Sequence, residues 1–204
     1  WAKTAADASF SKIEISRNVA GDNDVTFELK YCGICHTDVH IGNNDMQDTK
    51  YPCVPGHELA GVVTAVGSGV TKVKVGDRVG VGCIVDSCMG CEGCDVGEEH
   101  MCRKGMTGAF NIEITHGHLK TNTGWTFGGY SGSQTVHERF IVKIPDGFPM
   151  EAAGPVFCAG ITMFSPLSKF GARKGGLNVG IIGIGGLGQM GVQLAKAMGN
   201  TVTA

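Results

Sequence analysis

The sequence predicts a protein with a β-rich, antiparallel first part and the opening of a parallel α/β sheet at its end. Short runs rich in β-branched residues, separated by glycine turns, fill residues 25–85. After residue 176, a short apolar run leads into a glycine-rich turn with helical spacing behind it. The first pattern is typical of an antiparallel barrel or sandwich. The second is typical of a strand and helix in a doubly wound parallel sheet.

Four segments of the first part have the composition of strands. They are VTFELKY (25–31), ELAGVVTAV (58–66), VKVGDRVGVGCIV (73–85) and TVHERFIVKIP (135–145). Residues 150–170 are apolar and helical in their first half, and Pro155 and Pro166 are expected to limit where that helix continues.

The last part begins with LNVGIIG (177–183), which is expected to be a parallel strand buried on both faces. Apolar residues at helical spacing follow to Met198, and TVTA (201–204) is expected to begin another strand. One strand, one helix and part of a strand cannot bury both faces of a sheet. We therefore expect this chain to be part of a longer, truncated one.

Composition limits the class of protein. The chain has 42% hydrophobic and 18% charged residues and a net charge of -2, which does not favour binding to nucleic acid or to an anionic membrane surface. The beginning lacks a signal peptide pattern, and no window reaches the roughly 18 apolar residues of a spanning helix. We expect a cytoplasmic protein, in which nine cysteines are metal ligands, catalytic groups or buried thiols.

Four cysteines in SCMGCEGCDVGEEHMC (87–102) have the spacing of a metal site. Four thiolates suit tetrahedral zinc, and a site with four protein ligands keeps no position for substrate, so the predicted role is structural. Iron–sulfur and a loop without a ligand are the alternatives. The predicted ligands are Cys88, Cys91, Cys94 and Cys102.

A second group of metal-binding residue types is spread over CGICHTDVH (32–40), PGHE (55–58) and FCAG (157–160). Each cysteine alone would be read as a buried thiol, and Cys32 with Cys35 could form a redox pair, although no thioredoxin-like pattern surrounds them. Two cysteines and one histidine together are a ligand set of zinc sites that keep a position open for water or substrate.

The glycine fingerprint GxGxxG occurs twice near the end. With 33 glycines in the chain, about one match is expected by chance. The match at Gly183, Gly185 and Gly188 lies between the apolar strand and the helix, whereas the match that begins at Gly186 would lie inside the helix. We favour the first as a dinucleotide turn. The acidic residue that would select the cofactor falls at or beyond residue 204, so the sequence does not separate NAD from NADP.

These motifs, in this order, resemble the zinc-dependent medium-chain alcohol dehydrogenases, and within them the aldehyde reductases similar to cinnamyl alcohol dehydrogenase. The motifs are CGICHTDVH, PGHELAGVV, the four spaced cysteines, GGYS, the CAGIT run with SPL, and GIGGLG. The resemblance implies a GroES-like zinc-binding catalytic domain over residues 1–152. Residues 153–204 would be the N-terminal part of a Rossmann dinucleotide-binding domain.

The resemblance also implies roles for single residues. Cys35, His57 and Cys158 would hold a catalytic zinc, with Glu58 as an occasional fourth ligand. Asp38 would orient His57 from behind. For Cys32, Cys53 and Cys83 the resemblance adds no role, and they are expected to be packing thiols. The proton relay would be Thr37 and His40. The cofactor contacts would be His36, Thr162, Gly183, Gly185, Gly186, Leu187 and Gly188.

The implied activity is hydride transfer between a nicotinamide cofactor, NADP(H) rather than NAD(H), and a small alcohol or aldehyde. Two zinc ions per chain and a homodimeric full-length protein are implied too. The alternative is a zinc-stabilised fragment or binding module without catalysis. The residues do not name the alcohol or aldehyde.

Overall fold

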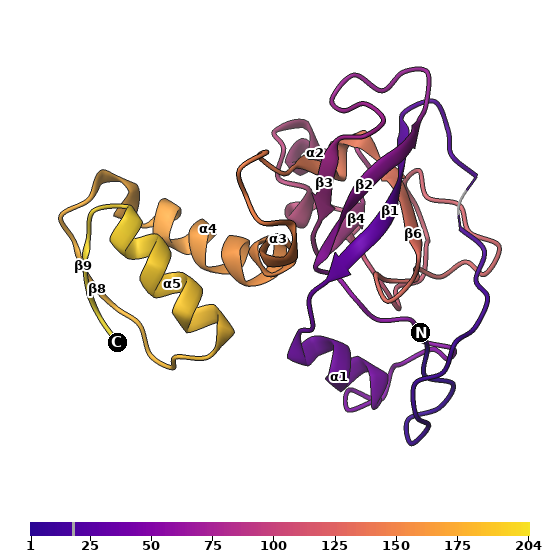
Figure 1. The fold of residues 1–204 in the computed structure, drawn as a ribbon, viewed down its shortest axis with the longest axis horizontal. Coiled ribbons are helices and arrows are strands. Elements are labelled where there is room, and N and C mark those ends of the chain that lie inside the picture. The colour runs from indigo at the N-terminus through magenta and orange to yellow at the C-terminus, as the bar shows by residue number, and fades with distance from the viewer. Residues whose placement is uncertain (18) are drawn as a thin grey trace. The chain divides into compact units, whose positions relative to one another are not determined.

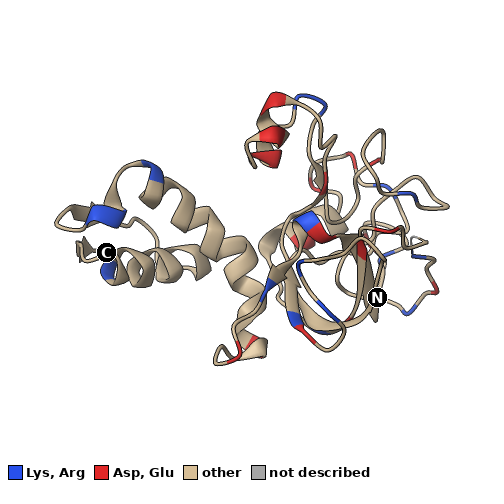
Figure 2. Cartoon of the chain, turned by 90° about the horizontal axis from the view of Figure 1, so that it is seen from above, with Lys and Arg blue, Asp and Glu red and all other residues tan. Residues whose placement is uncertain are grey.

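The computed structural model describes residues 1–17 and 19–204 and divides the chain into two compact units (Figure 1). The first unit is Trp1–Gly154 and the second is Pro155–Ala204. No helix in these ranges is both long enough and apolar enough to span a bilayer. Lys and Arg residues occur in both units, whereas all Asp and Glu residues belong to the first unit (Figure 2).

A five-stranded antiparallel sheet forms the centre of the first unit (Figure 1). Its order is β6(Ser133–His137), β1(Asp24–Cys32), β2(Leu59–Val66), β3(Arg78–Val81) and β7(Val142–Lys143). Val25 and Phe27 of β1 are fully buried and face Val66 and Val63 of β2. The period-two burial is what the sequence predicts for a strand with one face on a core. The predicted β-rich first part is confirmed.

Two of the predicted strand segments are divided by turns. The segment 73–85 contains β3 and β4(Ile84–Asp86), and the segment 135–145 contains β6 and β7 with the 3-10 turn η2(Glu138–Phe140) between them. β4 pairs with β5(Thr107–Gly108) in a second small sheet. Between β4 and β5 lie the short helices α2(Glu92–Asp95) and η1(Glu99–Met101). Of the four spaced cysteines in this segment, Cys94 lies within α2, Cys88 and Cys91 precede α2, and Cys102 follows η1.

The helix α1(His36–Gly42) follows β1 directly, where the sequence patterns do not predict a helix. Its start depends on a side chain within it, because Asp38 Oδ2 accepts the backbone N–H of Cys35 at 2.9 Å. An acidic side chain in the first turn also interacts favourably with the helix dipole. The helix contains the second half of the CGICHTDVH motif, from His36 to His40, and holds these residues in a helical arrangement.

The helical stretch that begins at the end of the first unit and continues into the second differs in part from its prediction. A helical run of α3(Ala153–Pro155), the π-helix η4(Val156–Gly160) and α4(Ile161–Lys169) follows the 3-10 turn η3(Met150–Ala152). Pro166 lies inside α4, although it was expected to limit that helix. The helix continues for three residues after the proline, with the Pro166 carbonyl accepting from Phe170 N–H at 2.9 Å, and then ends at Lys169. A proline lacks its own N–H donor and crowds the preceding turn, but its carbonyl can still accept within the helix.

The rest of the second unit contains a parallel strand pair, as predicted. The 3-10 turn η5(Ala172–Lys174) leads to β8(Asn178–Gly180), which pairs in parallel with β9(Thr201–Thr203), and α5(Gly186–Ala197) connects them. The expected burial of residues 177–183 on both faces is wrong, since Ile182 is fully exposed and β8 has three residues. A two-stranded sheet with one connecting helix does not offer enough surface to cover both faces.

Candidate metal and cofactor sites

The four spaced cysteines lie together, as their spacing predicts. Their sulfur atoms all lie within 4.8 Å of one another. Cys94 Sγ is 3.5 Å from Cys91 Sγ and 3.9 Å from Cys88 Sγ. Tetrahedral zinc with Zn–S bonds of about 2.3 Å separates its sulfur ligands by about 3.8 Å. The donor set and its spacing therefore fit zinc.

The surrounding backbone favours ionised thiols in this cluster. Arg103 N–H lies 3.4 Å from Cys91 Sγ, and Cys88 N–H lies 3.4 Å from Cys102 Sγ. The Arg103 N–H, followed by that of Cys94, lowers the pKa of Cys91 to about 6, and the Cys88 N–H is the largest cause of a lowered pKa at Cys102. The Gly90 N–H acts to lower the pKa of Cys88, but burial and the three neighbouring cysteines together outweigh it and raise this pKa to about 11. Because zinc binds thiolates, these contacts suit a metal site.

The cysteines outside the two predicted ligand sets have different environments. None of the nine cysteines forms a disulfide within residues 1–17 and 19–204. Cys53 is buried, and burial raises the pKa of the half-buried Cys32 thiol to about 12, which does not suit a redox nucleophile. Cys83 is exposed, so its prediction as a packing thiol is wrong. It lies in the turn between β3 and β4, where side chains face solvent.

A second donor cluster lies in the first unit. Cys35 precedes α1, and His57 and Glu58 lie directly before β2. Their ligand atoms lie within 4.8 Å of one another. His57 and Glu58 are each 5% exposed. Gly33 makes room for Glu58, since a Cβ at residue 33 would lie 1.9 Å from Glu58 Oε2.

The side chain of Asp38 contacts two members of this cluster, Cys35 and His57, and Asp38 is only 1% exposed. Its Oδ1 accepts from His57 Nδ1 at 3.1 Å and from Gly56 N–H at 3.0 Å. Its Oδ2 accepts from Cys35 N–H at 2.9 Å and from the Tyr130 hydroxyl at 3.0 Å. A carboxylate is an acceptor only, so Nδ1 of His57 carries the proton and Nε2 is the nitrogen that would ligate a metal.

The residues predicted as a proton relay lie along α1. Thr37 Oγ1 is 3.6 Å from Cys35 Sγ. His40 Nδ1 lies 2.7 Å from Asp45 Oδ2, and the ring of His40 stacks on that of His36 with 4.4 Å between centroids. His36 and Thr37 are exposed on this helix. Since a carboxylate only accepts hydrogen bonds, Nδ1 of His40 carries a proton toward Asp45, and Nε2 is the ring nitrogen with a lone pair in the neutral imidazole.

The second unit contains the other predicted residues. Cys158 is 8% exposed within the π-helix η4, and Thr162 is exposed in α4. The glycine turn precedes α5: Gly183 has a left-handed φ of 87°, and a Cβ at Gly188 would lie 1.9 Å from the Gly183 carbonyl oxygen. Such a turn needs glycine at both positions. Gly185, Gly186 and Leu187 form the start of this helix, and Leu187 is exposed.

Sequence reasoning missed two polar partners of the predicted site residues, Asp45 beside His40 and Tyr130 beside Asp38. Tyr130 lies in the GGYS motif, but its partner Asp38 is 92 residues away, and the contact depends on how two loops pair. Asp45 lies five residues after His40, just past the helix end. Since side chains that meet on a helix are three or four residues apart, the sequence offers no helical spacing that would indicate this contact.

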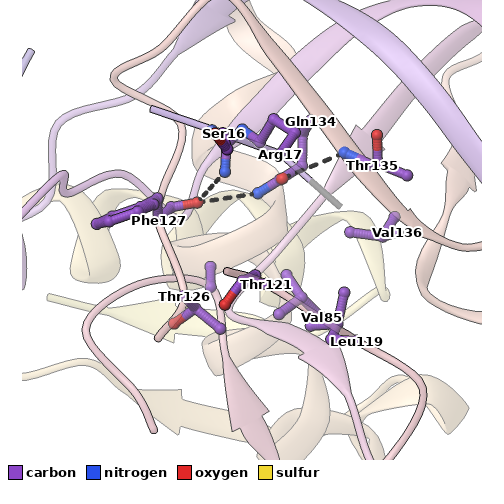
Figure 3. A pocket seen from close by; sticks show the side chains of 11 residues that line it. Ser16, Arg17, Val85, Leu119, Thr121, Thr126, Phe127, Gln134, Thr135 and Val136 are labelled. Carbon is purple, nitrogen blue, oxygen red and sulfur yellow. Dashed lines mark hydrogen bonds between the residues drawn. The ribbon is translucent and has the colours of Figure 1, made fainter. Parts of the chain in front are cut away.

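A small cavity of about 20 Å³ lies between the N-terminal segment, β4 and β6 (Figure 3). Gln134 Nε2 donates to the Phe127 carbonyl at 3.2 Å, and Gln134 Oε1 accepts from Thr135 N–H at 3.2 Å. Arg17 also donates to Phe127, and burial lowers the pKa of Arg17 to about 10. The cavity has room for about one water molecule, and Arg17 ties the N-terminal segment to the loop that precedes β6.

Comparisons with known proteins identify the family. The alcohol dehydrogenase GroES-like domain matches residues 21–146, which is more than half of the chain. A probable mannitol dehydrogenase from Fragaria ananassa is 48% identical over 100% of this chain and 55% of its own length. The NADP-dependent alcohol dehydrogenase C 1 from Mycolicibacterium smegmatis is 48% identical over 100% of this chain and 56% of its own.

A solved cinnamyl alcohol dehydrogenase from Sorghum bicolor matches with a TM-score of 0.91 and 44% identity over 99% of this chain and 56% of its own. The chain thus spans little more than half the length of these relatives. The predicted fold class, a GroES-like β-domain followed by the opening of a Rossmann sheet, agrees with these matches. Domain match, sequence identity and shared architecture together show that the chain belongs to the medium-chain alcohol dehydrogenase family, among relatives named cinnamyl and mannitol dehydrogenases.

Proposed function

We propose that the protein containing this chain is a zinc-dependent oxidoreductase that interconverts primary alcohols and aldehydes with a nicotinamide cofactor. The observation that carries the proposal is the convergence of Cys35, His57 and Glu58 on one buried point, with Asp38 holding His57 in the tautomer that a metal ligand needs. A buried cluster with a thiol, an imidazole and a carboxylate fits zinc in its catalytic form.

The proposed ligands of the catalytic zinc are Cys35, His57 and Cys158, with Glu58 as an occasional fourth ligand. The proposed structural zinc is bound by the four spaced cysteines, which gives two zinc ions per chain. When bound, the catalytic zinc polarises the substrate oxygen as a Lewis acid, and the nicotinamide gives or accepts the hydride.

The residues of this chain then position groups and move a proton. The Thr37 hydroxyl, close to Cys35 Sγ, passes a proton between the substrate oxygen and His40. His40 exchanges that proton with solvent through Nε2, because Asp45 holds the proton on Nδ1. Asp38 keeps His57 from rotating, so that the ligand geometry is present before substrate arrives.

The proposed cofactor site uses the glycine turn before α5. Gly183, Gly185, Gly186, Leu187 and Gly188 would present backbone N–H groups to the pyrophosphate at the helix start. His36 would contact the pyrophosphate and Thr162 the nicotinamide. We propose NADP(H) over NAD(H), since one relative is named an NADP-dependent alcohol dehydrogenase and a solved cinnamyl alcohol dehydrogenase from Helicobacter pylori is complexed with NADP(H).

The same proposal covers the whole protein. Residues 1–152 would be the catalytic domain and residues 153–204 the opening of the dinucleotide-binding domain of a homodimeric, cytosolic enzyme. Its substrates would be small alcohols and aldehydes rather than macromolecules.

The test uses the full-length protein. We expect two zinc ions per chain and oxidation of NADPH by cinnamaldehyde, measured as a falling absorbance of the reduced cofactor, with slower turnover of NADH. Cys158→Ser should lower turnover by roughly 10³-fold or more, because several kcal/mol of transition-state stabilisation depend on the catalytic metal. The structural zinc should remain bound. Cys83→Ser, at an exposed cysteine outside both ligand sets, is the matched control and should keep full turnover.

One tight zinc per chain and no absorbance change with any aldehyde would instead identify a zinc-stabilised module without catalysis. Unchanged turnover in Cys158→Ser would show that the proposed ligand set is wrong.

A further inference from the structure

Tyr130 reaches the candidate zinc site through a loop that the backbone holds in register with the His57 segment. Gly128 N–H donates to the Val54 carbonyl at 2.7 Å, Gly129 N–H to Gly56 at 2.9 Å, and Tyr130 N–H to Pro55 at 2.9 Å. These three successive backbone hydrogen bonds fix the backbone of Tyr130 next to residues 54–56, which immediately precede His57.

The close approach of these two loops requires glycines. A Cβ at Gly128 would lie 2.4 Å from the carbonyl oxygens of Pro55 and Gly56. A Cβ at Gly56, whose φ is 109°, would lie 2.7 Å from Gly129 N. Since backbone atoms cannot move aside as side chains can, the position of Tyr130 is tightly determined.

The Tyr130 side chain points at Asp38. Its hydroxyl donates to Oδ2 at 3.0 Å, and its ring is held edge-on by Phe10, with 6.1 Å between centroids. Burial, followed by the nearby Asp38 carboxylate, raises the pKa of the Tyr130 phenol, so this group is a protonated donor at neutral pH.

Asp38 receives four donors, which match the roughly four lone-pair positions of a carboxylate. His57 Nδ1 and Gly56 N–H use Oδ1, while Cys35 N–H and the Tyr130 hydroxyl use Oδ2. Three of these donors belong to the two segments that carry Cys35 and His57. Tyr130 is the donor that comes from a third segment, and it binds Oδ2, whereas His57 binds Oδ1.

We infer that Tyr130 is a positioning residue for the zinc ligand His57 and that it acts through Asp38. The inference rests on the proposed zinc-dependent function. The phenol fixes the rotation of the Asp38 carboxylate, so Oδ1 stays in line with His57 Nδ1 and the imidazole keeps one orientation. Groups that orient a metal-bound imidazole typically change metal affinity by about 10- to 100-fold when removed.

Tyr130→Phe tests this role, because it removes the hydroxyl and keeps the ring that packs on Phe10. In the full-length enzyme, we expect about 10-fold weaker binding of Co²⁺ at the catalytic site, read from the visible absorption bands of the bound cobalt during competition with a chelator. The metal at the four-cysteine site should be retained in the same sample.

Tyr51→Phe is the matched control. The Tyr51 hydroxyl donates to the Gly42 carbonyl at 2.9 Å, at the end of the same helix α1, and does not contact Asp38. This variant loses the same chemical group and a hydrogen bond of similar length, and it should bind Co²⁺ at the catalytic site as the unmodified enzyme does.

Equal Co²⁺ affinity in Tyr130→Phe and the unmodified enzyme would overturn the inference. A parallel loss of metal at both sites, or the same loss in Tyr51→Phe, would overturn it too, since the effect would be general destabilisation. If the unmodified enzyme binds one metal and has no turnover, the proposed function fails. If it binds two metals and turns over while Tyr130→Phe is unchanged, the inference about Tyr130 fails alone.

Discussion

Asp38 combines two tasks that would otherwise need two residues. It accepts the N–H of Cys35 and so begins helix α1, and it accepts from His57 Nδ1 and so orients a proposed ligand. Burial of a charged carboxylate is costly unless hydrogen bonds replace its water. Here four donors do so. An asparagine could not replace it, because its amide nitrogen would face donors rather than accept from them.

Gly33 should be intolerant of a side chain for a specific reason. In Gly33→Ala, the new Cβ would overlap Glu58 Oε2, and the carboxylate would have to leave its position in the donor cluster. We expect a loss of about 1–3 kcal/mol of unfolding free energy, measured by chemical denaturation, together with weaker metal binding at the Cys35–His57–Glu58 cluster.

Gly147→Ala is the control for this substitution, because a Cβ there meets no atom within 4 Å. It should leave stability and metal binding unchanged. If Gly33→Ala binds metal normally, Glu58 is not held in place by the space at residue 33.

At the scale of elements, Arg139 connects the cysteine lobe, which is residues 88–102, to the five-stranded sheet of the first unit. Arg139 belongs to the turn η2 between β6 and β7. Its side chain donates to Glu99 in η1 and to the backbone carbonyl of Cys94 in α2. Because the lobe contains only short helices, we expect this contact with Arg139 to limit how far the lobe can move away from the sheet.

Replacing this tether should weaken the four-cysteine site. Arg139→Gln removes a charge-assisted contact worth about 1–2 kcal/mol, and we expect zinc release from the lobe to a chelator to be roughly 5- to 10-fold faster. The measurement is the rate at which a colorimetric chelator captures the metal.

Arg103→Gln is the matched control. Arg103 pairs with Glu92 in the same lobe, but both side chains are more than 70% exposed, and such surface pairs contribute little. The backbone N–H of Arg103 next to Cys91 Sγ is unchanged in this variant. Equal release rates in the two variants would show that Arg139 does not restrain the lobe.

The elements differ in how well the sequence predicts them. Strands β1 and β2 follow from alternating β-branched residues, since this local pattern matches a half-buried strand. Helix α1 has only seven residues, and Asp38 organises its first turn, so its hydrophobic pattern is too short to predict a helix. The exposure of Ile182 could not be predicted, because a strand's burial depends on what covers it and not on its own residues.

For the molecule as a whole, the two candidate sites were predictable to different degrees. The four-cysteine site lies in one continuous segment, and spacing alone predicts that its sulfurs converge. Cys35 and His57 belong to separate segments, so only the family resemblance relates them. Tyr130 was not predicted as part of the site, because its contact depends on the pairing of loops 54–56 and 128–130.

The stability of the first unit should fall as the pH is lowered through the histidine range. Burial, followed by the neighbouring His118, lowers the pKa of His137 below its usual 6.5, while Asp24, Glu138 and Asp86 oppose this shift. The folded unit therefore binds fewer protons than the unfolded chain near pH 6. This contribution to stability is complete above pH 6.5 and is lost as the pH falls toward the folded-state value.

We expect the thermal midpoint to fall between pH 7.5 and pH 5.5, and to fall less in His137→Asn. The asparagine oxygen can still accept the Arg139 N–H that His137 Nδ1 accepts at 3.1 Å. His100→Asn, at an exposed histidine, should show the pH dependence of the unmodified protein. An unchanged slope in His137→Asn would assign the pH dependence to other groups.

The distribution of the proposed ligands along the chain sets an order for metal uptake during synthesis. The cysteine lobe closes a loop within residues 88–102, whereas the proposed catalytic ligands extend from Cys35 to Cys158. Closing the longer loop costs roughly 2 kcal/mol more in chain entropy. A ribosome that has released residue 102 has already exposed a complete thiolate site, while the catalytic ligand set is still unfinished. If the proposed structural zinc is bound, the nascent chain should therefore acquire it first, before the proposed catalytic ligands come together.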